Sequence, residues 1–404
     1  MTRRRFHGVA AGAATALAFG GCAHTAPRSR AEAAAGLGYR GGAETPVALA
    51  ALPRGSLREA VARAVRAACE AATDFAWLSR GDRVLVKPAS NSANPHPATS
   101  DPTAVHALVR LLLEKGAGRV VVADMSGVQF VRFSQDRLSG STRAIMQANG
   151  IARAAEEAGA QVHAFEEAGW DGFDPETPAA TGHWQGPLWM PALLREVDHV
   201  VLLPRCSRHL LAGSTLGLKC GVGWWRHDSR LEYHRDAASF SEKTADASTV
   251  PSLAAKQRLV LTAATKVLAT FGPDDGRVVE PETGLVVAST DVVAHDLVSL
   301  AWLLEGRALL PPGARRGLFD DPNSSEAFVN AANRIVTHWL GGLGQALRAQ
   351  RLRRYDLDTV WDDRVLRRAF ANAGGVPRVA LADADGSLPP ALLGRLAAEA
   401  SLPA

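Results

Sequence analysis

The sequence predicts an α/β protein, with a mostly parallel sheet, helices on both faces and a helical appendage at its C-terminal end. Two observations support this prediction. Short runs of Val, Leu and Ala, mostly bounded by Pro, Gly or Asp, alternate with longer segments of helical periodicity. The runs are apolar at successive positions, as in strands covered on both faces. With 404 residues, 47% of them apolar, the chain can bury a substantial core.

The predicted strands, in chain order, are 45–50, 83–88, 119–124, 161–165, 199–205, 258–264 and 284–290. The predicted helices are 56–73, 102–115, 141–159 and 291–305, followed by 325–340 and 362–373 in the appendage. Asp101 followed by Pro102 is typical of a helix N-cap with Pro in the first turn. The stretch 166–191 is rich in Pro, Gly and Trp and is expected to run over the surface.

The N-terminal 22 residues resemble an export signal. A twin-arginine match at 2–6 precedes an apolar stretch from Val9 to Phe19, which is too short to span a bilayer. Phe19-Gly-Gly-Cys22 then resembles a lipobox. We therefore expect the twin-arginine export machinery to carry the protein out and a lipid on Cys22 to hold it at the periplasmic side of the membrane; cleavage nearby without lipidation is the alternative.

The same composition sets the expected domain boundaries. Residues 23–44, with Pro, Ser, Ala and Gly, are predicted to form a flexible tether. The α/β domain is predicted to span 45–320, and a helical C-terminal region, 321–404, is expected to pack on it.

Charge and cysteine content exclude two classes of partner or cofactor. The net charge is only +4 and the basic residues are dispersed, so nucleic acid is not an expected partner. Beyond the signal the cysteines are Cys69, Cys206 and Cys220, without the clustered spacing of an iron–sulfur site. No iron–sulfur cluster is expected, and no other cofactor is predicted. A Cys206–Cys220 disulfide remains possible.

Polar residues follow several predicted strands directly. Lys87, Asp124, Arg205 and Asp291 occupy such positions. In a parallel sheet the carboxyl ends of the strands share one edge, where ligands bind, so we expect these side chains to gather there. Asn91, in the long polar loop after Lys87, fits either turn formation or a ligand contact.

The segment GSTLGLKCGVGWWRHDSRLEYHRD, 213–236, combines glycines with cationic and aromatic side chains and is expected to fold over that edge. Lys219, Arg230 and Arg205 would bind a carboxylate or phosphate there, and His209 and His234 would transfer protons. Thr215 is a further candidate ligand-binding residue of this segment. Only six of the chain's 45 basic residues are Lys, which makes Lys219 notable.

Residues of the same segment also fit purely structural roles. The Trp224–Trp225 pair fits a core position or a ligand platform. His227 is expected in an exposed loop, and Arg230 with Glu232 fits an exposed ion pair equally well.

The chain resembles the DUF362 family, a domain of unknown function, over roughly 80–300. The matching stretches are "VLVKPASNSA", "VVVADMSG", "VVLLPRCSRHLLAGSTLGLKCGVGW" and "FGPDDG" with the later "DVVAHD". The family pattern falls on Lys87, on Arg205 with His209, on Thr215 with Lys219 and Gly223, on His234, on Gly272-Pro273 with Gly276, and on Asp291 with Asp296. Arg205 replaces a usual Lys and Cys220 a usual Asn, and the ferredoxin-like cysteines of many relatives are missing. The resemblance implies no settled activity.

Three functions fit these residues. The first is an exported, enzyme-like domain that binds a small anionic ligand through Lys and Arg and uses His209, Lys219 and His234 as catalytic groups. The second is a lipoprotein that binds a ligand without chemistry. The third is a metal-binding protein that uses Cys and His residues of 206–234, although their spacing fits no standard zinc site.

The export signal gives the first prediction. Replacing Arg3 and Arg4 by Lys is expected to leave precursor in the cytoplasm, and Cys22→Ser is expected to release folded protein from membranes. Cell fractionation with immunoblotting measures both. A Cys22→Ser protein that stays in the membrane fraction would contradict the lipid anchor and make residues 9–19 the anchor instead.

Overall fold

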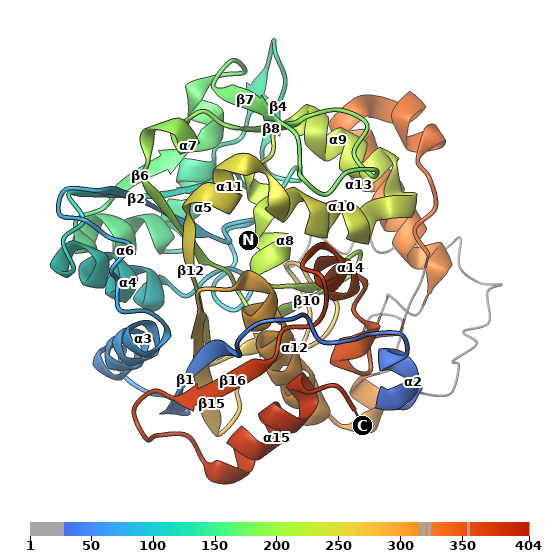
Figure 1. Cartoon of the computed structure of the whole chain (residues 1–404). Coiled ribbons are helices and arrows are strands. Elements are labelled where there is room, and N and C mark those ends of the chain that lie inside the picture. The colour runs from blue at the N-terminus through green and yellow to red at the C-terminus, as the bar shows by residue number, and fades with distance from the viewer. Residues whose placement is uncertain (1–27, 316–319, 322–324, 354–355, 404) are drawn as a thin grey trace.

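An eight-stranded sheet forms the centre of the protein in the computed structural model (Figure 1), which describes residues 28–315, 320–321, 325–353 and 356–403. The order of strands across the sheet is β16-β1-β15-β12-β9-β2-β3-β6. Their bounds are β1 Thr45–Pro53, β2 Arg83–Pro88, β3 Arg119–Asp124, β6 Gln161–Ala164, β9 His199–Leu203, β12 Gln257–Ala264, β15 Thr283–Ser289 and β16 Val379–Asp383.

The sheet is mostly parallel, as predicted, and β15 is its exception. β2 pairs in parallel with β3 and β9, while β12 pairs in parallel with β9, and β3 with β6. β15 runs antiparallel to both of its neighbours, β1 and β12. The carboxyl ends of β2, β3, β9 and β12 therefore share one edge of the sheet, and β15 ends at the opposite edge.

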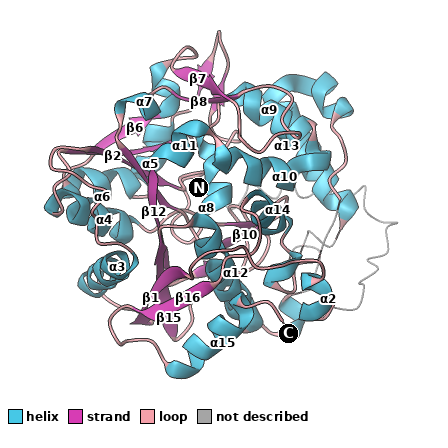
Figure 2. Ribbon diagram, in the orientation of Figure 1, coloured by secondary structure: helices cyan, strands magenta, loops and turns pink. Residues whose placement is uncertain are grey.

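Helices cover both faces of the sheet (Figure 2). On one face α3 (Arg58–Ala72), α4 (Pro102–Glu114) and α6 (Ile151–Ala158) pack against every second side chain of the strands. On the other face α12 (Val292–Ala308) and α15 (Pro390–Ala400) cover one half, and the chain from 206 to 253 covers the other half. Because both faces are buried, the strands are apolar at successive positions.

The remaining elements surround this sandwich. The helices are α2 Arg30–Ala34, α5 Thr142–Ala148, α7 Leu193–Glu196, α8 Gly217–Cys220, α9 His227–Arg235, α10 Phe240–Asp246, α11 Pro251–Lys256, α13 Glu326–Arg348 and α14 Arg364–Asn372. A small sheet has the order β11-β10-β13-β14, with bounds Gly213–Thr215, Ser207–His209, Val267–Leu268 and Val278–Val279. The two-stranded pairs are β4 Arg132–Phe133 with β5 Leu138–Ser139, and β7 Phe173–Glu176 with β8 Leu188–Pro191.

Two segments differ from the sequence-based expectation. Residues 28–44 do not form a free tether, because α2 begins with a capping box at Ser29 and buries Ala33 in the core, and Tyr39 bridges to Val376. The C-terminal region is largely helical, but it also adds β16 to the edge of the sheet beside β1. Small Ala side chains permit this close packing of α2.

The stretch 166–191 also has more structure than a surface excursion. Its β7–β8 hairpin buries Phe173, Leu188 and Met190 in the core. The Trp and Phe side chains of this Pro- and Gly-rich stretch supply apolar surface that packs against the core and fixes the stretch in place.

The expected signal at 1–22, including Cys22, lies outside the described residues. None of the helices in the described part of the chain combines the length and hydrophobicity needed to cross a membrane.

The direction of β15 leads to a prediction about Asp291. Its carboxylate caps α12 through the N–H groups of Val293 and Ala294 and pairs with Arg40 at 2.6 Å. Asp291→Ala should lower the free energy of unfolding by about 1–2 kcal/mol, whereas Asp291→Asn should lose less because Asn still caps a helix. Chemical denaturation measures both. A drop in ligand affinity in either variant would contradict the placement of Asp291 away from the site.

Candidate functional site

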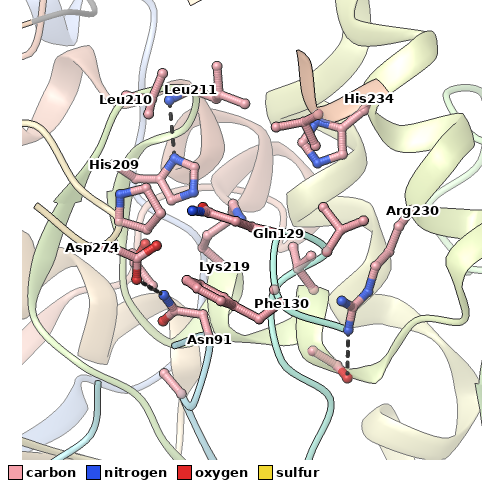
Figure 3. Close-up of a pocket in the computed structure, with 18 of the residues that line it drawn as sticks. Asn91, Gln129, Phe130, His209, Leu210, Leu211, Lys219, Arg230, His234 and Asp274 are labelled. Carbon is pink, nitrogen blue, oxygen red and sulfur yellow. Dashed lines mark hydrogen bonds between the residues drawn. The ribbon is translucent and has the colours of Figure 1, made fainter. Parts of the chain in front are cut away.

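A cavity of about 260 Å³ opens at the carboxyl edge of β2, β3 and β9. Figure 3 shows Lys219 and Phe130 in its middle, with His209 and Asp274 on one side and His234 and Arg230 on the other. The cavity is lined by the predicted site residues Lys87, Asn91, Asp124, Arg205, His209, Thr215, Lys219, Arg230 and His234. Segments far apart in the sequence thus meet at one place, as the parallel strands require.

A buried ion pair forms the floor of the cavity. Lys87, at the end of β2, lies 2.7 Å from Oδ1 of Asp124, at the end of β3, and both side chains are almost fully buried. The Lys87 ammonium also donates to the carbonyls of Pro88 and Cys220, at 2.9 and 3.1 Å, and lies 5.5 Å from the Trp224 ring centre. Lys87 is therefore committed to protein contacts and holds the 220–224 turn against the strand ends.

Gly223 sits directly on this ion pair. A Cβ at this position would overlap Asp124 Oδ1 and Lys87 Nζ. Asp124 is fixed from the other side by the N–H groups of Ser90 and Met125, at 2.7 and 2.8 Å. A side chain at 223 would have to displace the Lys87 ammonium or the Asp124 carboxylate from these contacts, so this position favours Gly.

The short helix α8 presents Lys219 to the cavity. The Asp296 carboxylate accepts hydrogen bonds from the N–H groups of Gly217 and Leu218, both at 2.8 Å, and so holds the N-terminus of α8. His295 contacts Asp296 at 2.8 Å and Thr262 at 2.9 Å. Asp296 is a positioning residue that the sequence analysis named only through the family pattern.

Lys219 is the group of the site whose pKa lies nearest neutral pH. Burial, followed by the nearby Arg205 and Arg230 guanidinium groups, lowers its pKa from 10.5 to about 7. Within the described residues its ammonium forms no ion pair with a carboxylate, and it lies 5.8 Å from the ring centre of Tyr233. An amine with this pKa exists in both protonation states near neutral pH.

The two histidines are held in opposite tautomers. Nδ1 of His209 accepts hydrogen bonds from the N–H groups of Leu211 and Ala212, at 3.1 and 3.3 Å, so its Nε2 carries the proton. Nδ1 of His234 contacts Asn333 Oδ1 at 2.8 Å, and Nδ2 of that Asn donates to the His234 carbonyl. This arrangement makes His234 Nδ1 the donor and leaves its Nε2 as a proton acceptor.

Both imidazoles are neutral at physiological pH. Burial, with the nearby Lys219 charge, lowers the pKa of His209 well below 6.5. Burial above all lowers the pKa of His234 to about 3, although its bond to Asn333 acts the other way. His209 is thus suited to donate a hydrogen bond and His234 to accept one, and Lys219 has the pKa best matched to proton transfer.

The two arginines of the site bind backbone carbonyls. Arg230 donates to the carbonyls of Trp225, Ser126 and Met125, at 2.9, 2.7 and 2.9 Å. Its burial contradicts the alternative of an exposed pair with Glu232, which instead pairs with Lys243 at 3.2 Å. Burial lowers the pKa of Arg230 to about 10, so it remains charged.

Arg205 donates to the carbonyls of Ala98 and Pro273, the latter at 2.6 Å. Burial lowers its pKa to about 10 despite the nearby Asp274. Its Nε, and Oγ1 of the 5% exposed Thr215, are buried without a hydrogen-bond partner among the described residues. Both residues line the cavity. Buried polar atoms in native proteins are normally paired, so these two atoms suit a ligand with acceptor oxygens.

Asn91 contacts an acidic residue that the sequence analysis did not select. Its Nδ2 donates to Asp274 Oδ1 at 2.5 Å, and Nδ2 of Asn94 donates to the Asp274 carbonyl at 3.2 Å. Burial raises the pKa of Asp274. The signal was present in the "GPDDG" motif, whose glycines were noted but whose acids were not. Gln129, Phe130 and Trp339 also line the cavity and carry no motif of their own.

The structure corrects the expectations for Asp291 and His227 and favours one of the two alternatives for the Trp pair. Asp291 does not line the cavity, because β15 is antiparallel. His227 is buried on α9, where Nε2 contacts the Val131 carbonyl at 3.0 Å, and burial lowers its pKa to about 3. Trp224 and Trp225 are core residues.

The metal alternative finds no support. Cys206 and Cys220 are free thiols and do not form a disulfide. Across the described part of the chain, no group of three or more His, Cys, Asp or Glu side chains is arranged to hold a metal ion. Cys220, in place of the family's usual Asn, lies 3.7 Å from Lys87 Nζ.

Residues 84–301 match the sequence model of the family described as "Domain of unknown function (DUF362)". The chain belongs to this family. Its motif residues Lys87, His209, Thr215, Lys219 and His234 meet around one cavity in this DUF362 protein.

The DUF362 chain is also weakly similar to solved structures. The lactate racemase apoprotein from Thermoanaerobacterium thermosaccharolyticum is 14% identical, with a TM-score of 0.37, over 61% of this chain and 54% of that one. A structural-genomics target from Thermotoga maritima is 14% identical, with a TM-score of 0.34, over 56% of this chain and 54% of that one. This chain thus spans about half the length of these structures, and such similarity carries no argument about activity. None of the curated proteins matches the chain.

The contact between Gly223 and the ion pair generates a prediction. Gly223→Ala should destabilise the protein by about 3 kcal/mol or more, because its methyl group separates a buried ion pair. Gly221→Ala is the matched control in the same turn, since a Cβ there meets only Trp224 at 3.7 Å, an ordinary contact. Thermal and chemical denaturation compare the two variants. Equal stability of the two would contradict the role of the ion pair.

Proposed function

We propose that this DUF362 protein is an enzyme that binds a small anionic molecule in the cavity and uses Lys219 for proton transfer. The observation that carries the proposal is the partly buried Lys219 ammonium, which lines the cavity without a carboxylate partner in the described chain, near two further cations, Arg205 and Arg230. An anion would neutralise this charge and offer oxygens to Thr215 Oγ1 and Arg205 Nε, which have no hydrogen-bond partner among the described residues.

The pKa values assign the roles within the site. General acid–base catalysis is most efficient when the pKa of the group lies near the working pH. Lys219, at about 7, meets this condition, whereas His234, at about 3, does not. In the proposal His209 Nε2–H orients the ligand as a donor, His234 Nε2 accepts a hydrogen bond, and Lys219 gives or takes the proton.

A ligand-binding protein without chemistry is the alternative. It would use the same cations but would return its ligand unchanged. Incubating a small-molecule extract of the source cells with the protein, followed by mass spectrometry, separates the two functions. Conversion of a compound by the wild type, but not by Lys219→Met or by the His209→Gln, His234→Gln double variant, supports an enzyme. Capture of a compound without conversion supports the binding protein.

We further propose that the site works outside the cytoplasm, on a lipid anchor at Cys22. The support is the twin-arginine and lipobox resemblance of residues 2–22. The fractionation experiment described above tests this location independently of the chemistry.

The pKa of Lys219 predicts how binding depends on pH. The anion binds the charged amine, so affinity for butanoate is expected to be constant below pH 7 and to fall above it, by up to about ten-fold per pH unit. The bound anion raises the pKa of Lys219, and the affinity stops falling once the pH exceeds this higher pKa of the complex. Lys219→Arg, which stays charged, should bind with a flat profile from pH 6.5 to 8.5. Isothermal titration calorimetry measures these affinities.

Lys219→Met serves as the control for folding. It should lose butanoate binding by at least about ten-fold, the scale of a hydrogen bond to a charged group. The empty variant should nevertheless be more stable than the wild type. This gain should be largest below pH 7, where the partly buried amine is charged, and should vanish above the ordinary lysine pKa of 10.5. Unchanged butanoate affinity in a stable Lys219→Met protein would rule out the proposed anion site.

A further inference from the structure

One wall of the cavity is apolar, in contrast to the side lined by the cations Arg205, Lys219 and Arg230. One stripe of α13 faces the cavity with residues spaced three and four apart: Phe328, Ala332, Ile335, Val336, Trp339 and Leu340. This spacing places them on one side of the helix. Side chains from other segments complete the wall: Val128, Phe130, Leu210, Leu211 and Phe271.

Much of this apolar wall is only partly buried. Ile335, Val336, Trp339 and Leu340 all retain intermediate exposure, and Phe130 is 37% exposed. An apolar group placed in the cavity would remove this surface from water, which is favourable in proportion to the area covered. The wall therefore favours a ligand with an apolar part.

The wall residues are held in place by specific contacts. Phe271 has a positive φ of 55°, a strained conformation for a bulky residue, and its ring lies 6.1 Å from that of Phe328. The Arg132 guanidinium lies 5.9 Å from the ring centre of Trp339. The contact with Phe328 places the Phe271 ring against α13.

The charges of the cavity limit the polar part of the ligand. Lys87 is paired with Asp124, and Asp274 acts on the Arg205 charge. Asp274 and Asp275 line the same cavity and would repel a multiply charged anion. Lys219 therefore suits a head group with a single negative charge, which favours a carboxylate over a phosphate.

We infer that the ligand of this site is an amphipathic carboxylate, with its head at Lys219 and Thr215 and its apolar body against the cavity-facing side of α13. This inference rests on the proposed function, whose anion it specifies. The two ends of the cavity differ in chemistry, so a molecule bound there is oriented with its carboxylate toward the strand ends.

The test is a series of straight-chain carboxylates from acetate to octanoate, titrated by calorimetry at pH 6.5. Each methylene buried against the wall is expected to raise affinity by about four-fold until the cavity is filled. Neutral 1-alkanols of the same length should bind at least ten-fold more weakly, because they lack the charge that Lys219 recognises.

Two variants of α13 distinguish an effect of the apolar wall on binding from a general effect of substitutions in this helix. Ile335→Ser places a hydroxyl in the wall and should flatten the dependence on chain length while leaving acetate affinity unchanged. Leu343→Ser is the matched control: Leu343 follows the non-helical Gly342 of α13, is 65% exposed and does not line the cavity. It should behave as the wild type. Thermal denaturation confirms that both variants fold.

The outcomes distinguish this inference from the proposed function. Affinities that do not change with chain length, but are lost in Lys219→Met, would overturn the apolar wall and leave the anion site intact. Affinities that rise with chain length equally for carboxylates and alkanols, and survive Lys219→Met, would overturn the anion site and the carboxylate head together. No binding by any carboxylate of the series would overturn the inference.

Discussion

The buried ion pair between Lys87 and Asp124 is the constraint on which the site depends. Lys87 and Asp124 lie at the ends of two neighbouring central strands. The backbone of Gly223 packs directly on the pair, where a Cβ atom would overlap both charged groups. The Lys87 ammonium also binds the carbonyl of Cys220, so the same interaction ties the 217–224 segment to the sheet. Lys219, in this segment, is thereby placed over the strand ends.

The cationic side chains of the site differ in the partners that surround them. Lys87 is paired with a carboxylate, whereas Arg205 and Arg230 donate hydrogen bonds to backbone carbonyls and keep their positive charge. Lys219 lacks a carboxylate partner in the described chain, and desolvation, followed by the nearby Arg205 and Arg230 charges, lowers its pKa to about 7. A partly buried charge in this state lowers the stability of the fold at that position. Such a trade is typical of functional sites.

Much of the fold could be predicted from local sequence. The strands at 83–88 and 119–124 and the N-cap at Asp101 are found where they were predicted, because continuous apolar runs and capping residues are local signals. The approach of Lys87, His209 and Lys219 to one cavity also followed from their places after strands and within a Gly-rich segment. The environments of His227 and Arg230 were mistaken, because polar helices such as α9 give no sign of burial in their sequence.

The sequence by itself determined the α/β class, the DUF362 membership and the chemical groups available to the site. These depend on residue type and spacing along the chain. The tertiary structure decided which groups act together. The antiparallel direction of β15 moved Asp291 to the opposite edge, and neighbouring N–H and amide groups set the tautomers of His209 and His234. It also turned the apolar stripe of α13 into a wall of the cavity. Strand direction, hydrogen-bond partners and burial depend on contacts between distant segments, which no local pattern records.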